Sequence, residues 1–487
     1  MQRACDSHDS PTSSIDSICL QHRPPKREPA LMASDHSPSV HPDGSESDGS
    51  STPLRRAISG KLLFVFILGD VLGAGIYALV GEIAGEVGGA IWLPMLLALL
   101  MALLTAASYA ELVTKYPRAG GAAVFAQRAF GRPIVSFLVG FSMLAAGVTS
   151  AGGLALAFSG DYLAVFLDVP AVPAAVVFLL LVGLLNARGI TESLRANLGM
   201  TVIEVSGLVV IIALAGLVLS RGDGAPSRVL EFTDDTTPTL AVLGAALLAF
   251  YSFVGFETSA NIAEEVEDVR RVYPRALLGA VTTAGAVYVL VGLAVSTVVP
   301  ADTLAQSTGP LLEVVDAADA GIPPWVFSLV ALVAVANGAL LTMIMASRLT
   351  FGMARDGLLP VALAKVLPGR KTPWAAIVAT TAVAMVLCTT GSVAALAETV
   401  VLLLLFVFIS TNIAVLVLRR DRSDTDHFRT PTALPVLALI TCAVLLTQQS
   451  AATWLRAGLL LAVGIALYYV GRVVSNKTAT EPRSITR

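Results

Sequence analysis

The chain has 487 residues, of which 55% are hydrophobic and only 14% are charged. Soluble domains carry about 25% charged residues, so this composition excludes an ordinary soluble protein and indicates one that crosses a membrane several times. The formal net charge is −3 and the basic residues are scattered over short loops, which excludes a nucleic-acid partner because such partners require a basic patch.

Residues 1–56 are rich in Ser, Pro, Asp and His and contain no apolar run. We therefore expect no cleavable signal peptide and a disordered cytoplasmic N-terminal tail, since the segment has too little apolar surface to offset the entropy of ordering. A membrane domain is expected over 57–472 and a cytoplasmic C-terminal tail over 473–487. The four cysteines show no pattern of a disulfide framework.

Apolar runs that are long enough to cross a bilayer as helices recur after the tail, so the sequence predicts an all-α polytopic membrane protein. Twelve spans are expected, at about 58–80, 90–113, 133–167, 172–187, 196–219, 240–263, 276–299, 324–354, 374–388, 394–418, 435–447 and 452–470. Lys and Arg in short loops mark the cytoplasmic side, and only Arg221, Arg228 and Arg456 fall on the other side. Both termini are therefore predicted to be cytoplasmic.

The first span contains the segment Gly69-Asp70-Val71-Leu72-Gly73-Ala74-Gly75-Ile76-Tyr77. Glycine in mid-helix costs about 1 kcal/mol relative to alanine, so three glycines beside an ionisable Asp70 predict an interrupted helix. At membrane depth, irregular backbone is tolerated only where it is buried in protein or lines a water-filled cavity. The alternative is close packing of two helices through Gly69 and Gly73.

A second interrupted span is expected over 247–259, with Gly255 at mid-depth and Glu257 beside it. The first and sixth spans run in opposite directions, and two such interruptions in oppositely oriented halves point to a transporter's binding site. Free N–H groups at a helix N-terminus attract an anion, whereas unwound carbonyls attract a cation. A site with both suits an α-amino acid, although an amine or a carboxylate remains an alternative.

Three carboxyl groups lie within spans, namely Asp70, Glu204 and Glu257. A charge at a helix centre costs about 2.5–3.5 kcal/mol on insertion scales, which makes intramembrane acids functional candidates. Burial disfavours the charged form of a carboxyl group, so each is a candidate for proton or ion coupling, the alternative being a purely structural hydrogen bond. Asn337 and Thr342 in the eighth span are candidates for the same coupling site or for an interhelical hydrogen bond.

Aromatic residues surround the second interruption. Tyr251 and Phe256 are candidate gates, and packing is the alternative role for these side chains and for those of Phe250 and Phe253. Nucleotide-binding, zinc and nucleophile motifs are lacking, so we expect no enzymatic activity, no cofactor and no metal.

Four groups of residues occur in a fixed order along the membrane domain. They are Gly73-Ala74-Gly75-Ile76-Tyr77; Tyr109-Ala110-Glu111-Leu112 with Pro117-Arg118-Ala119-Gly120-Gly121 and Ala129-Phe130-Gly131; Phe253-Val254-Gly255-Phe256-Glu257 with Glu264-Glu265 and Tyr273-Pro274-Arg275-Ala276; and Ser347-Arg348 with Ala354-Arg355-Asp356-Gly357-Leu358-Leu359-Pro360. Over about 61–420 the chain thereby resembles the amino acid–polyamine–organocation (APC) superfamily of permeases.

This resemblance implies a fold similar to that of the leucine transporter. Inverted repeats of five helices would cover 58–219 and 238–419, with two peripheral helices over 431–472. The substrate carboxylate would be bound by Gly73, Ala74, Gly75 and Ile76, and the ammonium group by backbone at Phe250, Phe253 and Val254, with Gly255 also in the site.

One position departs from the family. Many sodium-independent members carry a lysine in the fifth helix, whose ammonium group stands in for a sodium ion, and the matching position here is Glu204. A carboxyl group cannot imitate a cation, but it could titrate, or it could ligate a cation together with Asp70 and Thr342. Coupling to H⁺ is expected, with Na⁺ coupling and pure exchange as alternatives.

The sequence therefore predicts a secondary active transporter that moves amino acids across the plasma membrane by alternating access and is coupled to protons. Its partners would be the small-molecule substrate, H⁺ and membrane lipid. The alternatives are an amine or polyamine transporter, an amino acid exchanger, and a non-transporting sensor that signals through its N-terminal tail.

Overall fold

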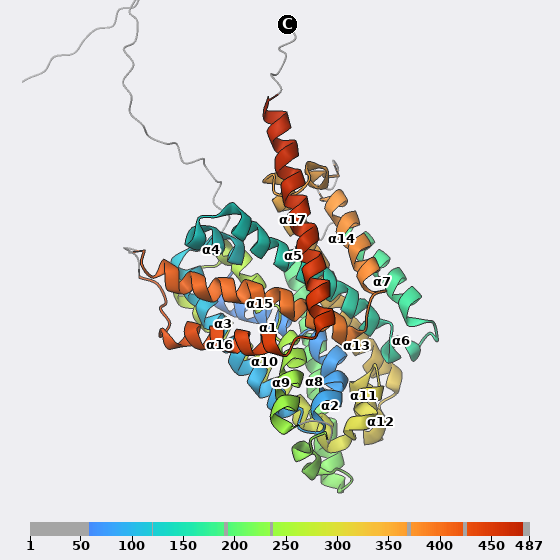
Figure 1. The fold of residues 1–487 in the computed structure, drawn as a ribbon. Coiled ribbons are helices and arrows are strands. Elements are labelled where there is room, and N and C mark those ends of the chain that lie inside the picture. The colour runs from blue at the N-terminus through green and yellow to red at the C-terminus, as the bar shows by residue number, and fades with distance from the viewer. Residues whose placement is uncertain are drawn as a thin grey trace, which may run out of the picture. The chain divides into compact units, whose positions relative to one another are not determined.

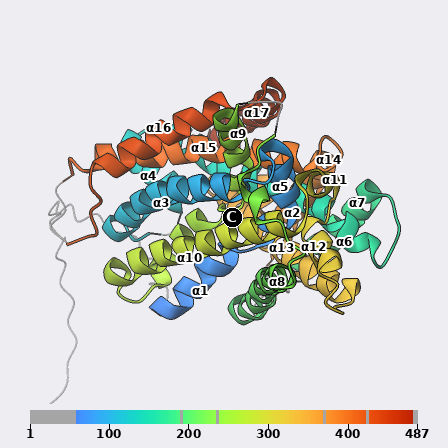
Figure 2. The same ribbon diagram turned by 90° about the horizontal axis from the view of Figure 1, so that it is seen from below.

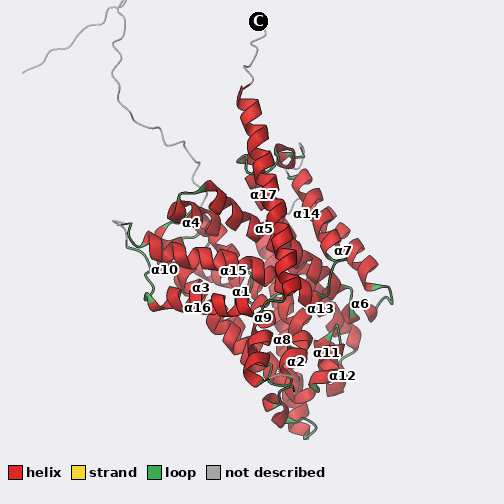
Figure 3. Ribbon diagram, viewed as in Figure 1, coloured by secondary structure: helices red, strands yellow, loops and turns green. Residues whose placement is uncertain are grey.

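The computed structural model describes residues 58–118, 120–188, 193–233, 237–367, 372–421 and 426–480, without the side chains of 193–198 and 472–480. The N-terminal tail expected over 1–56 lies outside the described residues. Within the described part of the chain Figure 3 shows only helices and loops, apart from an isolated backbone bridge between Ile58 and Val266. The predicted all-α fold class is therefore confirmed.

Nine segments in the described part of the chain are long and apolar enough to cross a membrane. Their helices, of which all but η2 are labelled in Figure 1, are α1 (Gly60–Val71) with α2 (Ala74–Val87), α3 (Trp92–Lys115), α5 (Pro133–Phe158) with α6 (Asp161–Ala164), α8 (Ser193–Arg221), α9 (Pro238–Tyr251) with the 3₁₀ helix η2 (Phe256–Glu265), α10 (Val269–Val298), α13 (Pro324–Arg355), α15 (Val393–Leu418) and α17 (Ala451–Thr480).

Three shorter apolar helices occupy the positions of the fourth, ninth and eleventh predicted spans. They are α7 (Ala171–Ala187), α14 (Trp374–Leu387) and α16 (Ala433–Thr447). The chain is thus a multi-pass membrane protein, and the count of twelve spans and the inverted repeat stay predictions.

The loops contain helices that the sequence analysis does not predict. They are α4 (Gly121–Phe130), η1 (Pro226–Leu230), α11 (Ala301–Gln306), α12 (Pro310–Ala318) and η3 (Val361–Ala364). Helix α17 also continues to Thr480, into the segment that was expected to be a tail over 473–487.

Local sequence accounts for several helix boundaries. Prolines occupy the first turn of α5, α9 and α13, namely Pro133, Pro238 and Pro324, where a missing N–H costs nothing because it would be unpaired anyway. Helix α15 is capped by Ser392, whose hydroxyl accepts a hydrogen bond from Ala395 N at 3.2 Å. These residues fix where the spanning helices begin.

Both predicted interruptions are present. In the first span, α1 ends at Val71 and α2 begins at Ala74. In the sixth span, α9 ends at Tyr251 and regular structure resumes at Phe256, after Gly255, whose φ of +129° lies in the region that favours glycine. The prediction of two broken helices is confirmed.

The two interrupted segments lie against each other through glycines. A Cβ atom on Gly75 would lie 2.7 Å from Ser252 Cα, and a Cβ atom on Gly255 would lie 2.9 Å from the carbonyl oxygen of Asp70. The end of the first segment (Gly75) thus contacts the start of the second (Ser252), and the start of the first (Asp70) contacts the end of the second (Gly255). The two segments therefore run antiparallel. This arrangement agrees with the opposite directions expected for the first and sixth spans.

Helix α10 lies beside α1 and α3 (Figure 2) and supports both interruptions. The hydroxyl group of Tyr288 is within hydrogen-bonding reach of the carbonyl oxygens of Val71 and, at 3.1 Å, of Ser252. The ring of Phe253 packs edge-on against Tyr288 at 5.2 Å between centroids. One tyrosine therefore provides a donor for backbone carbonyls that the breaks leave outside helices.

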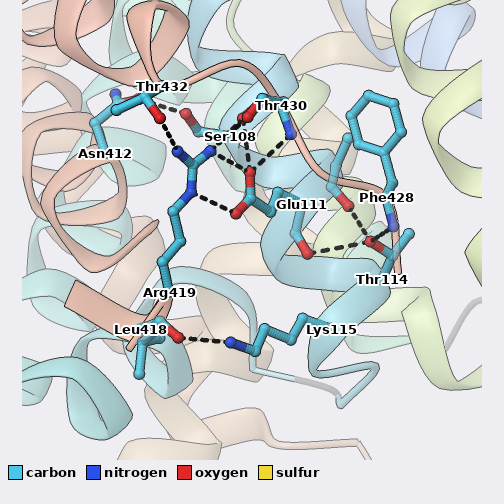
Figure 4. Close-up of polar contacts among 11 residues, drawn as sticks. Ser108, Glu111, Thr114, Lys115, Asn412, Leu418, Arg419, Phe428, Thr430 and Thr432 are labelled. Atoms are coloured by element: carbon cyan, nitrogen blue, oxygen red, sulfur yellow. Dashed lines mark hydrogen bonds and ion pairs between the residues drawn. The ribbon is translucent and has the colours of Figure 1, made fainter. Parts of the chain in front are cut away.

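A buried ion pair joins the end of α3 to the end of α15 (Figure 4). Glu111 accepts hydrogen bonds from Arg419 Nε at 2.8 Å and Nη2 at 2.6 Å, and from the backbone N–H and the hydroxyl of Thr430 at 2.9 and 2.7 Å. Arg419 also donates to the hydroxyl of Thr432 at 2.8 Å. Lys115 Nζ donates to the Leu418 carbonyl at 2.5 Å. These contacts anchor the loop that leads to α16.

We predict that Gly75→Ala destabilises the protein by about 1–3 kcal/mol, because the added methyl group would overlap the backbone of the opposite segment. The matched control is Gly216→Ala in α8, where no atom lies within 4 Å of the added Cβ atom and a gain of up to about 1 kcal/mol is expected. Thermal unfolding in detergent compares the two variants. Equal melting temperatures would contradict the close contact between the interruptions.

We also predict that Arg419→Met destabilises the protein by about 3–5 kcal/mol, because it leaves the Glu111 carboxylate buried without its cation. The control is Arg355→Gln, which removes an exposed ion pair with Asp356 at 3.8 Å and should change stability by less than about 1 kcal/mol. Denaturation of both variants provides the comparison. A loss with Arg419→Met no larger than that of the control would show that the buried pair does not hold α3 to α15.

Candidate functional site

A cavity of about 310 Å³ lies where the two interruptions meet. Gly73, Ala74 and Gly75 line it from the first interruption, and Ser252, Val254 and Gly255 line it from the second. At such breaks, backbone N–H and C=O groups lack helical partners. The cavity therefore brings backbone donors and acceptors from two antiparallel segments to one place.

An apolar wall completes the cavity. Helix α5 contributes Met143, Ala146, Gly147, Ser150 and Leu154, whose spacing places them on one face of the helix. Helices α13 and α15 add apolar side chains that include those of Leu341, Val400 and Leu404. Ser150 is the exception on the α5 face, and its hydroxyl group lies 2.7 Å from that of Tyr251.

Two carboxyl groups line the cavity close to the interruptions. Asp70 accepts a hydrogen bond from the hydroxyl of Thr258, and Glu257 accepts one from the Gly255 N–H at 3.0 Å. Ser252 also lines the cavity, and its buried hydroxyl has no hydrogen-bond partner among the described residues. The polar part of the cavity is thus concentrated around the irregular backbone.

Glu204 lies behind the wall of the cavity and is fully buried. Its Oε1 atom accepts a hydrogen bond from Asn337 Nδ2 at 2.9 Å, and Asn337 itself lines the cavity. Its Oε2 atom is buried and lacks a hydrogen-bond partner in the described part of the chain. The hydroxyl of Tyr77, on α2, donates to the backbone carbonyl of Glu204 at 2.6 Å. Glu204 is therefore one side chain away from the cavity.

The candidate residues named from the sequence divide into two groups. Those that line the cavity are Asp70, Gly73, Ala74, Gly75, Tyr251, Val254, Gly255, Glu257, Asn337 and Thr342. Those that do not are Ile76, Glu204, Phe250, Phe253 and Phe256. Phe250 and Phe256 instead pack against Phe408, with centroids 5.8 and 5.5 Å apart. The roles assigned to all these residues stay predictions.

Several lining residues were not anticipated. Thr258 and Asn261 follow the second interruption within about two turns, and Ser150 and Arg348 come from other helices. Tyr288, which supports both interruptions, was also not singled out. Arg348 carried a usable signal, because a cation within a spanning helix is rare enough to suggest a role. The direction in which the side chains of Ser150 and Tyr288 point could not be predicted from a single sequence.

The cavity extends toward the end of the bundle where α1 begins. Phe66 of α1, Ile262 of η2 and the exposed Arg348 of α13 belong to its lining. On the α2 side the lining ends at Gly75 within the described residues. There the hydroxyl of Tyr162 donates to the Tyr77 carbonyl at 3.1 Å.

Comparison with known proteins identifies relatives that match most of the chain. The chain is 26% identical over 446 residues to the branched-chain amino acid permease of Bacillus subtilis, covering 86% of this chain and 93% of that protein. It is 31% identical over 431 residues to an uncharacterized transporter of Mycobacterium tuberculosis, covering 87% and 93%. It is 29% identical over 415 residues to the vacuolar cationic amino acid transporter 4 of Arabidopsis thaliana, covering 78% and 68%.

The sequence profile described as "Amino acid permease" matches residues 58–474. This match includes both interruptions, the cavity and Glu204. The chain therefore belongs to the amino acid permease family, within the APC superfamily.

Proposed function

We propose that the protein is a secondary active transporter that carries amino acids across the plasma membrane by alternating access. The observation that carries this proposal is the cavity bounded by two antiparallel interrupted helices. The names of two relatives support the substrate class, since one is called a branched-chain amino acid permease and another a cationic amino acid transporter.

In this proposal the substrate carboxylate is bound by N–H groups at the start of α2, around Gly73–Ile76, where the helix dipole favours an anion. The ammonium group is bound by carbonyls between Phe250 and Gly255. The side chain then lies on the apolar wall of α5, α13 and α15. A cavity of about 310 Å³ lies at the lower end of the range for small-molecule sites, which suits a single amino acid.

Amine or polyamine transport is the second candidate. The observation in its favour is that Asp70 and Glu257 both line the cavity, since a substrate with only positive charges requires acidic partners. Uptake of radiolabelled leucine, arginine and putrescine into proteoliposomes distinguishes the candidates. Saturable uptake of an amino acid is expected, whereas uptake of putrescine alone would overturn the proposal, and binding without uptake of any solute would favour a sensor.

We predict that the cavity faces the cytoplasm, because the loops at the end where α1 begins carry most of the basic residues. In a background with Cys5, Cys19, Cys388 and Cys442 replaced by Ser, Asn261→Cys should react with a membrane-impermeant thiol reagent from the cytoplasmic side. The control Val80→Cys, in α2, should stay unreactive, since Val80 is fully buried and is not among the residues that line the cavity. Labelling of Asn261→Cys from outside only would reverse this orientation.

We predict that Glu204 carries the coupling proton. Glu204→Gln should keep the hydrogen bond from Asn337, because its amide oxygen can replace Oε1, while losing the ability to titrate. The expected result is that an imposed pH gradient no longer drives accumulation of substrate in proteoliposomes, while exchange of labelled for unlabelled substrate continues.

The matched control for this test is Glu86→Gln, which alters an exposed carboxyl group on α2 and should keep the full response to the pH gradient. Asp70→Asn and Glu257→Gln test the other two intramembrane acids in the same assay. An undiminished response of Glu204→Gln to the gradient would exclude Glu204 as the proton carrier. A response to a sodium gradient in its place would identify Na⁺ as the coupling ion.

A further inference from the structure

An open surface groove, with a volume of about 580 Å³, lies between α1 and α10 and is separate from the candidate substrate site. Three of its lining residues are cations: Lys61 from α1, and Arg271 and Arg275 from α10. All three side chains are exposed. Because Arg271 and Arg275 are four positions apart, they project from the same face of α10.

No ion pair joins any of these three cations to an acidic residue within the described part of the chain. The acidic residues that precede α10, Glu267 and Asp268, are not among those that line the groove. Three positive charges therefore line one groove, and no acidic residue is found among the described residues of its lining.

The rest of the groove is apolar, with Phe64, Val65, Val272 and Ala276 in its lining. The two helices approach closely within the groove, since a Cβ atom on Gly60, which also lines it, would lie 3.0 Å from Val272 Cγ1. Figure 2 shows α1 and α10 side by side. A ligand here meets positive charge at one end and hydrocarbon at the other.

The position of the groove in the chain decides which ligand fits. Lys61 is the second residue of α1, and Arg271 and Arg275 lie in the first two turns of α10. Both helices are membrane-spanning candidates, so their ends lie at the level of the lipid headgroups, where long basic side chains extend toward the interface. Basic pockets between spanning helices bind anionic lipid headgroups.

We infer that this groove binds the headgroup of an anionic phospholipid. The phosphate group is bound by Arg271 and Arg275, whose guanidinium groups can each donate two parallel hydrogen bonds to phosphate oxygens, and by Lys61 from the facing helix. The glycerol and the upper part of an acyl chain contact Phe64, Val65 and Val272.

This inference is independent of the proposed transport function, and its primary measurement is lipid binding. Purified protein is reconstituted in phosphatidylcholine with and without phosphatidylglycerol, extracted, and analysed for retained lipid by native mass spectrometry. Each cation near an anionic lipid surface strengthens binding about 5-fold. We therefore expect Lys61→Gln, Arg271→Gln and Arg275→Gln each to weaken retention of phosphatidylglycerol about 5-fold, and the triple variant roughly 100-fold.

The matched control is the double variant Arg118→Gln/Arg132→Gln, which removes exposed cations that lie outside the groove and should retain phosphatidylglycerol like the unaltered chain. Equal retention by the groove variants and this control would overturn the inference. If the triple variant does not fold, the three single variants decide the question by the same comparison.

A second experiment distinguishes a lipid headgroup from free inorganic phosphate as the ligand of the groove. Inorganic phosphate is added to the protein in phosphatidylcholine alone, and thermal stability is compared with that in vesicles that contain phosphatidylglycerol. We expect stabilisation by the lipid only, and its loss in Arg271→Gln. Equal stabilisation by inorganic phosphate would show that the groove is a general anion site and would overturn the assignment to lipid.

Discussion

The structure depends on the contact between two segments that have left the helical conformation at the same depth. Gly75 lies against the backbone of Ser252, and Gly255 lies against the backbone of Asp70. Neither contact has room for a side chain, so glycine is required at both positions. The same residues leave backbone groups outside regular helices, and Tyr288 supplies a donor for the carbonyls of Val71 and Ser252. The same glycines therefore allow the two segments to pack closely and leave backbone N–H and C=O groups outside helices.

This arrangement places several buried polar residues of the membrane domain in one region. Asp70, Glu257 and Ser252 line the cavity directly, and Glu204 reaches it through Asn337. Each has at least one polar partner or faces the cavity, as the cost of burying polar groups requires. At the end of α3, by contrast, the ion pair of Glu111 with Arg419 anchors helices to a loop and lies outside the cavity lining.

Much of this organisation could be predicted from the sequence, because it rests on local signals. Glycines beside acids within apolar runs indicated both interruptions, and the opposite directions of the two spans indicated that they would meet. The direction in which a side chain points depends on how the helices pack, and it could not be predicted from the sequence. Phe250 and Phe256 were expected at the site, yet they pack against Phe408. Ser150 and Tyr288 were missed because neither is close in sequence to an interruption.

The most direct test of the account is a cryo-electron microscopy structure of the protein in lipid nanodiscs with a transported amino acid. We expect the chain to leave the helical conformation between α1 and α2, and again between α9 and η2. The density of the amino acid should lie between Gly73–Gly75 and Ser252–Gly255, with its carboxylate at the start of α2. Uninterrupted helices in either span, or a substrate bound elsewhere, would contradict the central claim.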